Sequence, residues 1–190
     1  MLGLKYFHDM EKQIKIDDKT FHLFLSQEQI KEKVAETVDW VDETYKESES
    51  LPVVIPILNG ALFYAMDVLR KTKRYYQWFP VKISSYTGME RGKMVDIQSS
   101  DLGFLRGRDV LIIEDIVDTG HTMAAFIAEL KSVLPRSIRL ATLLIKPDAL
   151  EMEVKPDYVG FEIGEEFIVG YGMDYNEKGR ALEHIYQYRG

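Results

Sequence analysis

The chain has 190 residues, of which 46% are hydrophobic and 29% charged, so its length and composition are those of a globular protein with one domain. Its formal net charge of -7 disfavours a general nucleic-acid surface, because phosphate backbones attract basic patches, and the absence of cysteine excludes disulfides and thiolate metal sites. No apolar run approaches the roughly 20 residues of a membrane span and no signal-peptide core opens the chain, so we expect a cytoplasmic protein without membrane or nucleic-acid partners.

The first predicted elements are a short strand and a long helix. The strand is expected around Phe21 to Leu25. Ser26 and Gln29 match a capping box, and apolar residues then recur at helical spacing, which predicts an amphipathic helix that ends before the polar residues 46–50. These apolar positions are Ile30, Val34, Val38, Val41 and Tyr45.

A second strand and helix follow. The apolar run from Pro52 to Leu58 predicts a strand, Asn59-Gly60 predicts a turn, and the next apolar residues predict a helix. The helix is expected to run through Leu62, Met66 and Leu69.

A polar stretch separates the next two predicted strands. Phe79, Val81 and Ile83 alternate as in a strand, and Met94 to Gln98 predicts another. Residues 87–93 between them are polar with two glycines, which is typical of a mobile loop.

The most informative segment runs from Val110 to Met123. Its apolar start, Val110 to Ile113, predicts a parallel strand that is covered on both faces, after which the charged residues form a loop. The turn Thr119-Gly120-His121-Thr122 can cradle a phosphate with backbone N–H groups and hydroxyls, ahead of a helix that opens at Met123. Glu114 and Asp115 suit sugar hydroxyls and a hydrated divalent cation. A ligand with a phosphate, a ribose and a metal fits all these groups.

The order of elements predicts an α/β fold. A further strand at Ile138 to Ile145 completes a β-loop-α alternation, which implies a mostly parallel sheet flanked by helices. Ligands bind beyond the carboxyl ends of such strands, so Asn59-Gly60, residues 115–122 and Lys146 are expected to converge there. Residues Tyr158 to Tyr188 break the alternation and are expected to form a small cap over this edge.

The segment Val110 to Met123 resembles the phosphoribosyl-pyrophosphate signature of type I phosphoribosyltransferases, and Glu114 to Gly120 resembles its hypoxanthine-guanine version. The likeness covers about positions 20 to 188. It implies the type I fold, with a core over roughly 27–147 and a hood built from the N-terminal segment and roughly 150–190. It also implies a purine-salvage transferase that converts hypoxanthine, and guanine as a second base, with phosphoribosyl pyrophosphate and Mg²⁺ to IMP or GMP. The same resemblance implies a homodimer or homotetramer.

The resemblance also assigns roles to individual residues. Phosphoribosyl pyrophosphate would be bound by Asn59, Gly60, Ser85, Tyr86, Glu114, Asp115, Asp118, Thr119, Gly120, His121, Thr122 and Arg180. The purine would be bound by Lys146, Phe167, Ile168 and Asp174, and the metal by Glu114, Asp115 and Asp174. Asp118 is the implied catalytic proton acceptor for purine N7, and Lys146 the donor to a 6-oxo group.

Three of these assignments carry details of their own, and one further residue departs from the family pattern. Asn59-Gly60 matches a pyrophosphate loop of unusual peptide geometry, in which the family often has Lys where this chain has Asn59; the backbone role does not need that side chain. Ser85-Tyr86 opens the expected lid, which would exclude water from the reaction. His121 is expected to contribute its backbone. Gly164 stands where the family commonly has Pro, a departure that is expected to loosen the cap without touching a ligand contact.

Two alternatives remain open at this point. A xanthine- or guanine-preferring phosphoribosyltransferase would keep nearly every residue named, because the atoms at purine C2 would be met largely by backbone carbonyls. A phosphoribosyl-pyrophosphate-sensing regulator that binds RNA or DNA would share the fold. The acidic charge, Asp118 and the segment from Phe167 to Asp174 weigh against the regulator.

Overall fold

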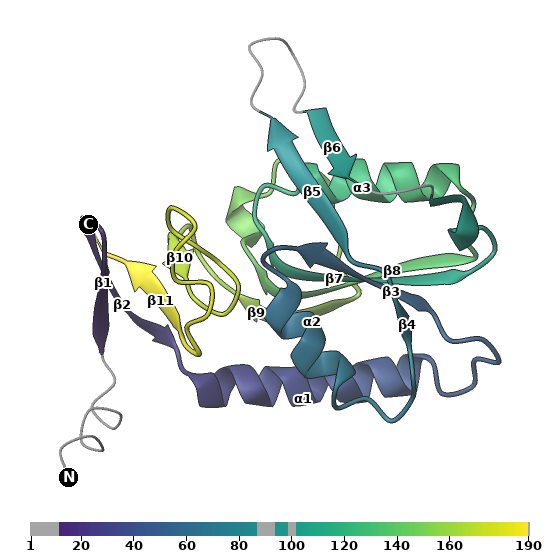
Figure 1. Cartoon of the computed structure of the whole chain (residues 1–190), viewed down its shortest axis with the longest axis horizontal. Helices are drawn as coiled ribbons and strands as arrows, with labels where there is room; N and C mark the ends of the chain where they lie inside the picture. The colour runs from purple at the N-terminus through teal and green to yellow at the C-terminus, as the bar shows by residue number, and fades with distance from the viewer. Residues whose placement is uncertain (1–11, 87–93, 99–101, 190) are drawn as a thin grey trace.

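The computed structural model describes residues 12–86, 94–98 and 102–189 (Figure 1), and for residues 84–86 and 94–98 it describes the backbone only. The expected lid loop at 87–93 lies outside the described residues, as do the side chains of Ser85 and Tyr86. Within the described part of the chain, no helix combines the length and the apolar character that crossing a membrane requires.

A mostly parallel, seven-stranded sheet forms the centre of the fold. Its strands are β3 (Val53–Leu58), β4 (Gln77–Trp78), β5 (Val81–Tyr86), β6 (Met94–Gln98), β7 (Asp109–Val117), β8 (Ser137–Ile145) and β9 (Tyr158–Glu162). Their order is β6-β5-β3-β7-β8-β9, with β4 beside β3, and only the β5–β6 pair is antiparallel. The apolar runs predicted from the sequence supply the central strands, which agrees with a sheet that is covered on both faces.

Helices cover both faces of this sheet (Figure 1). The helices α1 (Gln27–Thr44) and α2 (Leu62–Leu69) pack through Val34 and Tyr64 against a core that contains Leu111, while α3 (His121–Ser132) packs against the opposite face. The predicted capping box of α1 is present, since Ser26 Oγ accepts from the Gln29 amide at 3.3 Å and Gln29 Oε1 from the Ser26 amide at 2.9 Å. Two short 3₁₀ helices, η1 (Leu102–Leu105) and η2 (Pro147–Ala149), complete the connections.

A second sheet joins the two ends of the described chain. Its strands are β1 (Gln13–Ile16), β2 (Lys19–Leu25), β10 (Ile168–Val169) and β11 (Ile185–Tyr188), in the order β1-β2-β11-β10. All neighbours are antiparallel, and the sheet lies to one side of the central sheet (Figure 1). Phe21, Val169 and Tyr186 form its small core.

The prediction that residues 158–188 all belong to the cap is wrong for β9, which pairs in parallel with β8 in the central sheet. Tyr158 and Phe161 pack against the core beneath α1, which explains why this aromatic segment joins the sheet. A side chain at Gly160 would place its Cβ 2.6 Å from the Leu143 carbonyl oxygen, so the pairing requires glycine there.

Asp109, at the amino end of β7, forms side-chain hydrogen bonds with residues at the start of β8. Its buried carboxylate accepts from Arg136 Nε at 2.9 Å, from Arg136 Nη2 and from Ser137 Oγ at 2.6 Å. The hydrogen bonds from Arg136 lower the pKa of Asp109 below its ordinary value. We refer to these three residues as the Asp109 cluster.

Candidate active site

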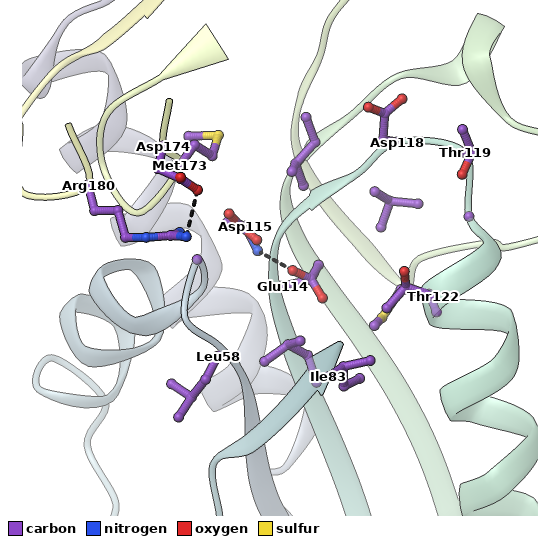
Figure 2. A pocket seen from close by; sticks show the side chains of 16 residues that line it. Leu58, Ile83, Glu114, Asp115, Asp118, Thr119, Thr122, Met173, Asp174 and Arg180 are labelled. Atoms are coloured by element: carbon purple, nitrogen blue, oxygen red, sulfur yellow. Dashed lines mark hydrogen bonds and ion pairs between the residues drawn. The ribbon is translucent and has the colours of Figure 1, made fainter. Parts of the chain in front are cut away.

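The candidate site is a cleft of about 360 Å³ at the carboxyl ends of β3 and β7. It gathers most of the polar residues that the sequence singled out, as expected from the strand-end rule. Figure 2 shows Thr119 and Thr122 on one side, Glu114 and Asp115 in the middle, and Asp174 with Arg180 on the other side. The predicted residues that line it are Gly60, Glu114, Asp115, Asp118, Thr119, Gly120, Thr122, Asp174 and Arg180.

Two carboxylates form the floor of the cleft. Glu114 and Asp115 were expected in a loop, but β7 continues to Val117 because β8 remains paired beside it through Ile145. Both residues are 7% exposed, and the Asp115 amide donates to Glu114 Oε1 at 3.2 Å. Burial, together with the neighbouring carboxyl of Asp115, raises the pKa of Glu114 well above its ordinary value.

A glycine turn leads from β7 into α3. The helix begins at His121, two residues earlier than expected, with Gly120 at the N-cap in a left-handed conformation (φ 82°) and without a side-chain cap. The Thr119 carbonyl accepts from the amides of Glu151 and Met152 at 3.0 and 3.2 Å. Both contacts brace the turn from outside and leave Thr119 and Gly120 lining the cleft.

The His121 side chain does not line the cleft. Its Nε2 atom lies 2.7 Å from Glu151 Oε2, on the same segment that braces the turn. The expected backbone contribution of His121 stays a prediction.

The turn after β3 packs tightly between two other segments. The Leu58–Asn59 peptide is cis, at the position where the family resemblance implied an unusual peptide geometry. A Cβ on Gly60 would overlap the Asp115 carboxylate, and a Cβ on Gly172 would overlap the Gly60 carbonyl. A larger residue would therefore displace the Asp115 carboxylate at position 60 or the Gly60 backbone at position 172. Gly60 borders the cleft, whereas Asn59 does not.

Asp174 and Arg180 are paired across a short loop. Arg180 Nη2 lies 2.6 Å from Asp174 Oδ1, and Arg180 Nη1 donates to the Gly172 carbonyl at 2.7 Å. The second Asp174 oxygen, Oδ2, accepts from the Glu177 amide at 2.7 Å. These contacts present one cation and one carboxylate to the same side of the cleft (Figure 2).

Lys146 does not itself line the cleft but is paired with Asp118, which does. Its Nζ lies 3.0 Å from Asp118 Oδ2, and its side chain is 11% exposed against 51% for Asp118. The Lys146 amide donates to the Val117 carbonyl at 3.0 Å, which fixes the lysine at the end of β8. The predicted convergence of these loops is confirmed.

The aromatic part of the predicted purine site lies apart from the cleft. Phe167 is 46% exposed, and Ile168 is buried in β10; neither lines the cleft. The Phe167 ring packs against Phe21 and Tyr175, with centroids 6.2 and 5.9 Å away. Ile168 thus lies in the second sheet, and Phe167 directly precedes its strand β10.

Reasoning from residue type missed the apolar walls of the cleft. Most of them adjoin a predicted polar residue in the sequence, which is the signal that could have identified them. The apolar lining consists of Ile57, Leu58, Ile83, Ile116, Val117, Met123 and Met173.

Comparison with known proteins identifies the family. The sequence model of the family described as "Phosphoribosyl transferase domain" matches residues 24–176 of this chain. The chain belongs to the phosphoribosyltransferase family. The expected type I phosphoribosyltransferase fold, a mostly parallel sheet flanked by helices, is confirmed for this phosphoribosyltransferase.

The similar proteins are named hypoxanthine or hypoxanthine-guanine phosphoribosyltransferases. The hypoxanthine-guanine phosphoribosyltransferase of Bacillus subtilis (strain 168) is 34% identical over 180 residues, covering 94% of this chain and 93% of the relative. The hypoxanthine phosphoribosyltransferase of Escherichia coli (strain K12) is 35% identical over 167 residues, covering 87% and 94%. The crystal structure of a hypoxanthine-guanine phosphoribosyltransferase from Bacillus anthracis matches with a TM-score of 0.80 and 31% identity, covering 91% of this chain and 99% of that one.

Proposed function

We propose that this phosphoribosyltransferase is a purine-salvage enzyme. It transfers the phosphoribosyl group of phosphoribosyl pyrophosphate to hypoxanthine, and to guanine as a second base, and releases pyrophosphate. One observation carries the proposal. A helix N-terminus, two buried carboxylates, an arginine and a glycine turn all line the same cleft. The names of the relatives support the choice of base.

The order of groups along the cleft matches the order of groups in the substrate. The 5′-phosphate fits the turn at residues 119–122, where the N–H groups of the first turn of α3 and the helix dipole favour an anion. The ribose hydroxyls fit Glu114 and Asp115 in the middle. The pyrophosphate fits the end formed by Gly60 and Arg180, with the backbone of Asn59 and the residues Ser85 and Tyr86 as further contacts.

The carboxylates of the cleft suit magnesium. Among the described residues no three His, Cys, Asp or Glu side chains form a metal-binding group. Magnesium commonly takes only one or two carboxylates and completes its shell with substrate phosphates and water. Glu114 and Asp115 on the ribose side and Asp174 on the pyrophosphate side would therefore hold it together with the substrate. When bound, magnesium supplies positive charge next to the departing pyrophosphate.

The pair of Lys146 and Asp118 gives the reaction its proton acceptor. Displacement at the ribose C1 has oxocarbenium character, and the incoming purine must lose a proton as the new bond forms. In the free protein the Lys146 ammonium forms an ion pair with Asp118 Oδ2. A purine whose 6-oxo group accepts from Lys146 draws the ammonium away, and Asp118 is then free to take the N7 proton.

The second sheet completes the purine site. We infer that β1, β2, β10 and β11 act as the hood, in which Phe167 stacks on the base and Ile168 offers backbone groups to its edge. We expect the enzyme to be cytoplasmic, to form a homodimer or homotetramer, and to bind neither nucleic acid nor membranes. Size-exclusion chromatography with light scattering measures the assembly directly.

A steady-state comparison of hypoxanthine, guanine and xanthine tests the proposal. With phosphoribosyl pyrophosphate and Mg²⁺, we expect the highest kcat/KM for hypoxanthine, turnover of guanine, and loss of activity when EDTA removes the metal. A highest kcat/KM for xanthine or guanine would replace hypoxanthine as the preferred base. Absence of turnover with all three bases, together with a gel shift of RNA or DNA, would favour a regulator instead.

A further inference from the structure

A tight turn connects the second sheet to the cleft. Tyr171 and Gly172 are its two central residues, between Gly170 and Met173, whose backbones exchange hydrogen bonds of 3.0 and 3.1 Å. Both central residues have positive φ, 48° for Tyr171 and 109° for Gly172, as in the mirror-image turns of tight hairpins. This conformation is an outlier for a bulky aromatic residue and persists only where its surroundings hold it in place.

The side chain of Tyr171 contacts α2, and its backbone amide donates to the Leu182 carbonyl at 2.9 Å. The side chain is buried, its hydroxyl donates to Asp67 Oδ2 at 2.7 Å, and its ring lies 6.4 Å from that of Phe63 between centroids. Burial, with the added effect of Asp67, raises the pKa of Tyr171, so the hydroxyl keeps its proton and donates. Asp67 and Phe63 both lie on the helix that follows Gly60 directly.

The other side of the turn belongs to the cleft. The Gly172 amide donates to the Arg180 carbonyl at 2.8 Å, and Arg180 Nη1 donates back to the Gly172 carbonyl at 2.7 Å. Gly172 also packs on the Gly60 carbonyl so closely that a Cβ would overlap it. Asp174 follows the turn two residues later and pairs with Arg180. The turn therefore touches both walls of the region that we assign to pyrophosphate.

We propose that Tyr171 is a positioning residue for the pyrophosphate end of the cleft. By bonding to Asp67 it fixes the Tyr171–Gly172 turn to α2, and so keeps Arg180 and Asp174 in register with Gly60. Tyr171 does not line the cleft and acts only through these residues. The inference rests on the proposed function for the identity of the ligand, but the restraint itself belongs to the free protein.

The variant Tyr171→Phe removes one hydroxyl and keeps the buried ring. We expect KM for phosphoribosyl pyrophosphate and Kd for pyrophosphate to rise roughly three- to tenfold, because only part of the free energy of the lost hydrogen bond to the Asp67 carboxylate reaches the pyrophosphate end of the cleft. KM for hypoxanthine should change much less, because the contacts of Lys146 and Phe167 lie with Asp118 and with Phe21 and Tyr175, not with the turn. Tyr64→Phe is the matched control. Tyr64 lies on α2, as Asp67 does, and its buried hydroxyl forms a hydrogen bond with Thr37 Oγ1 at 2.7 Å, away from the cleft. This control should lower Tm and leave both KM values unchanged.

Asp67 provides the rescue experiment. Asp67→Asn retains an oxygen that accepts from the Tyr171 hydroxyl and should keep KM for phosphoribosyl pyrophosphate near the wild-type value. Asp67→Ala should reproduce the effect of Tyr171→Phe, and the double variant should add no further loss. Equal increases in KM for both substrates, or additive losses in the double variant, would overturn the inference.

Hydrogen exchange separates this inference from the proposed function. Amides of residues 173–180 in the free protein should exchange faster in Tyr171→Phe than in the wild type or in Tyr64→Phe. Unchanged exchange would overturn the restraint even in an active enzyme. Faster exchange in a protein whose wild type lacks turnover would support the restraint and overturn the proposed function.

Discussion

Replacing Asp118 with asparagine tests the proton transfer at the centre of the proposed reaction. The amide keeps the shape of the side chain and still offers an oxygen to Lys146 Nζ, which lies 3.0 Å from the carboxylate, but it cannot take a proton at neutral pH. We expect kcat to fall on the order of 10²-fold or more, the usual scale for a lost general base. This is a rise of roughly 2.7 kcal/mol in the barrier, at about 1.36 kcal/mol for each factor of ten.

The free energy of unfolding should change much less than the barrier of the reaction. The Asp118 side chain is 51% exposed, so its ion pair with Lys146 contributes about 0 to 1 kcal/mol to the free energy of unfolding. The Tm should therefore fall by no more than about 4 °C in a chain of this size. The difference between a large kinetic loss and a small thermal shift distinguishes chemistry from misfolding.

Steady-state kinetics and thermal melting on the same preparation measure both quantities. KM for phosphoribosyl pyrophosphate should stay close to the wild-type value, because the phosphate turn and Arg180 are intact. Asp157→Asn is a matched control, since Asp157 is also ion-paired, 3.0 Å from Arg139, but does not line the cleft. Unchanged turnover of Asp118→Asn at neutral pH would remove Asp118 from the chemistry and refute the reasoning.

Three further substitutions address recognition, geometry and stability. Lys146→Met should raise KM for 6-oxopurines by the equivalent of roughly 1.5 to 3 kcal/mol, a lost charged hydrogen bond, and leave that for phosphoribosyl pyrophosphate unchanged; an equal increase in both would indicate a structural role. Gly60→Ala should abolish pyrophosphate binding in calorimetry, because its Cβ would overlap the buried Asp115 carboxylate and displace it from the cleft. The Cβ of Gly164→Ala would only approach Glu166 Oε2 to 3.0 Å, so this variant should bind normally; binding by both variants would contradict the packing argument. Asp109→Asn should lower the free energy of unfolding by about 1.5 to 3 kcal/mol at neutral pH, because it breaks the Asp109 cluster. The lowered pKa of Asp109 makes its contribution complete above the ordinary value of 3.8 and lost as pH falls through the folded value, so denaturant curves of wild type and variant should converge in acid; a constant gap would assign the stability to another group.

Much of the fold could be predicted from the sequence because its signals are local. The capping box at Ser26 and the apolar runs of the central strands specify their elements through neighbouring residues, and the structure contains them. The convergence of Gly60, Asp118 and Lys146 was also predictable, although they are far apart in the chain. Parallel strands end at the same edge of a sheet, so knowing three strand ends was enough to place the site.

Tertiary packing decided the rest. The segment at Tyr158–Glu162 has the composition of the cap, and only the fit of Gly160 against the Leu143 carbonyl and of its aromatic rings beneath α1 places it in the central sheet. Likewise, no local pattern joins Tyr171 to Asp67, a contact that spans 104 positions of the chain. A sequence pattern reports which residues can be buried or charged. Which of them touch across separate elements depends on how closely the backbones approach, and that distance exists only in the folded chain.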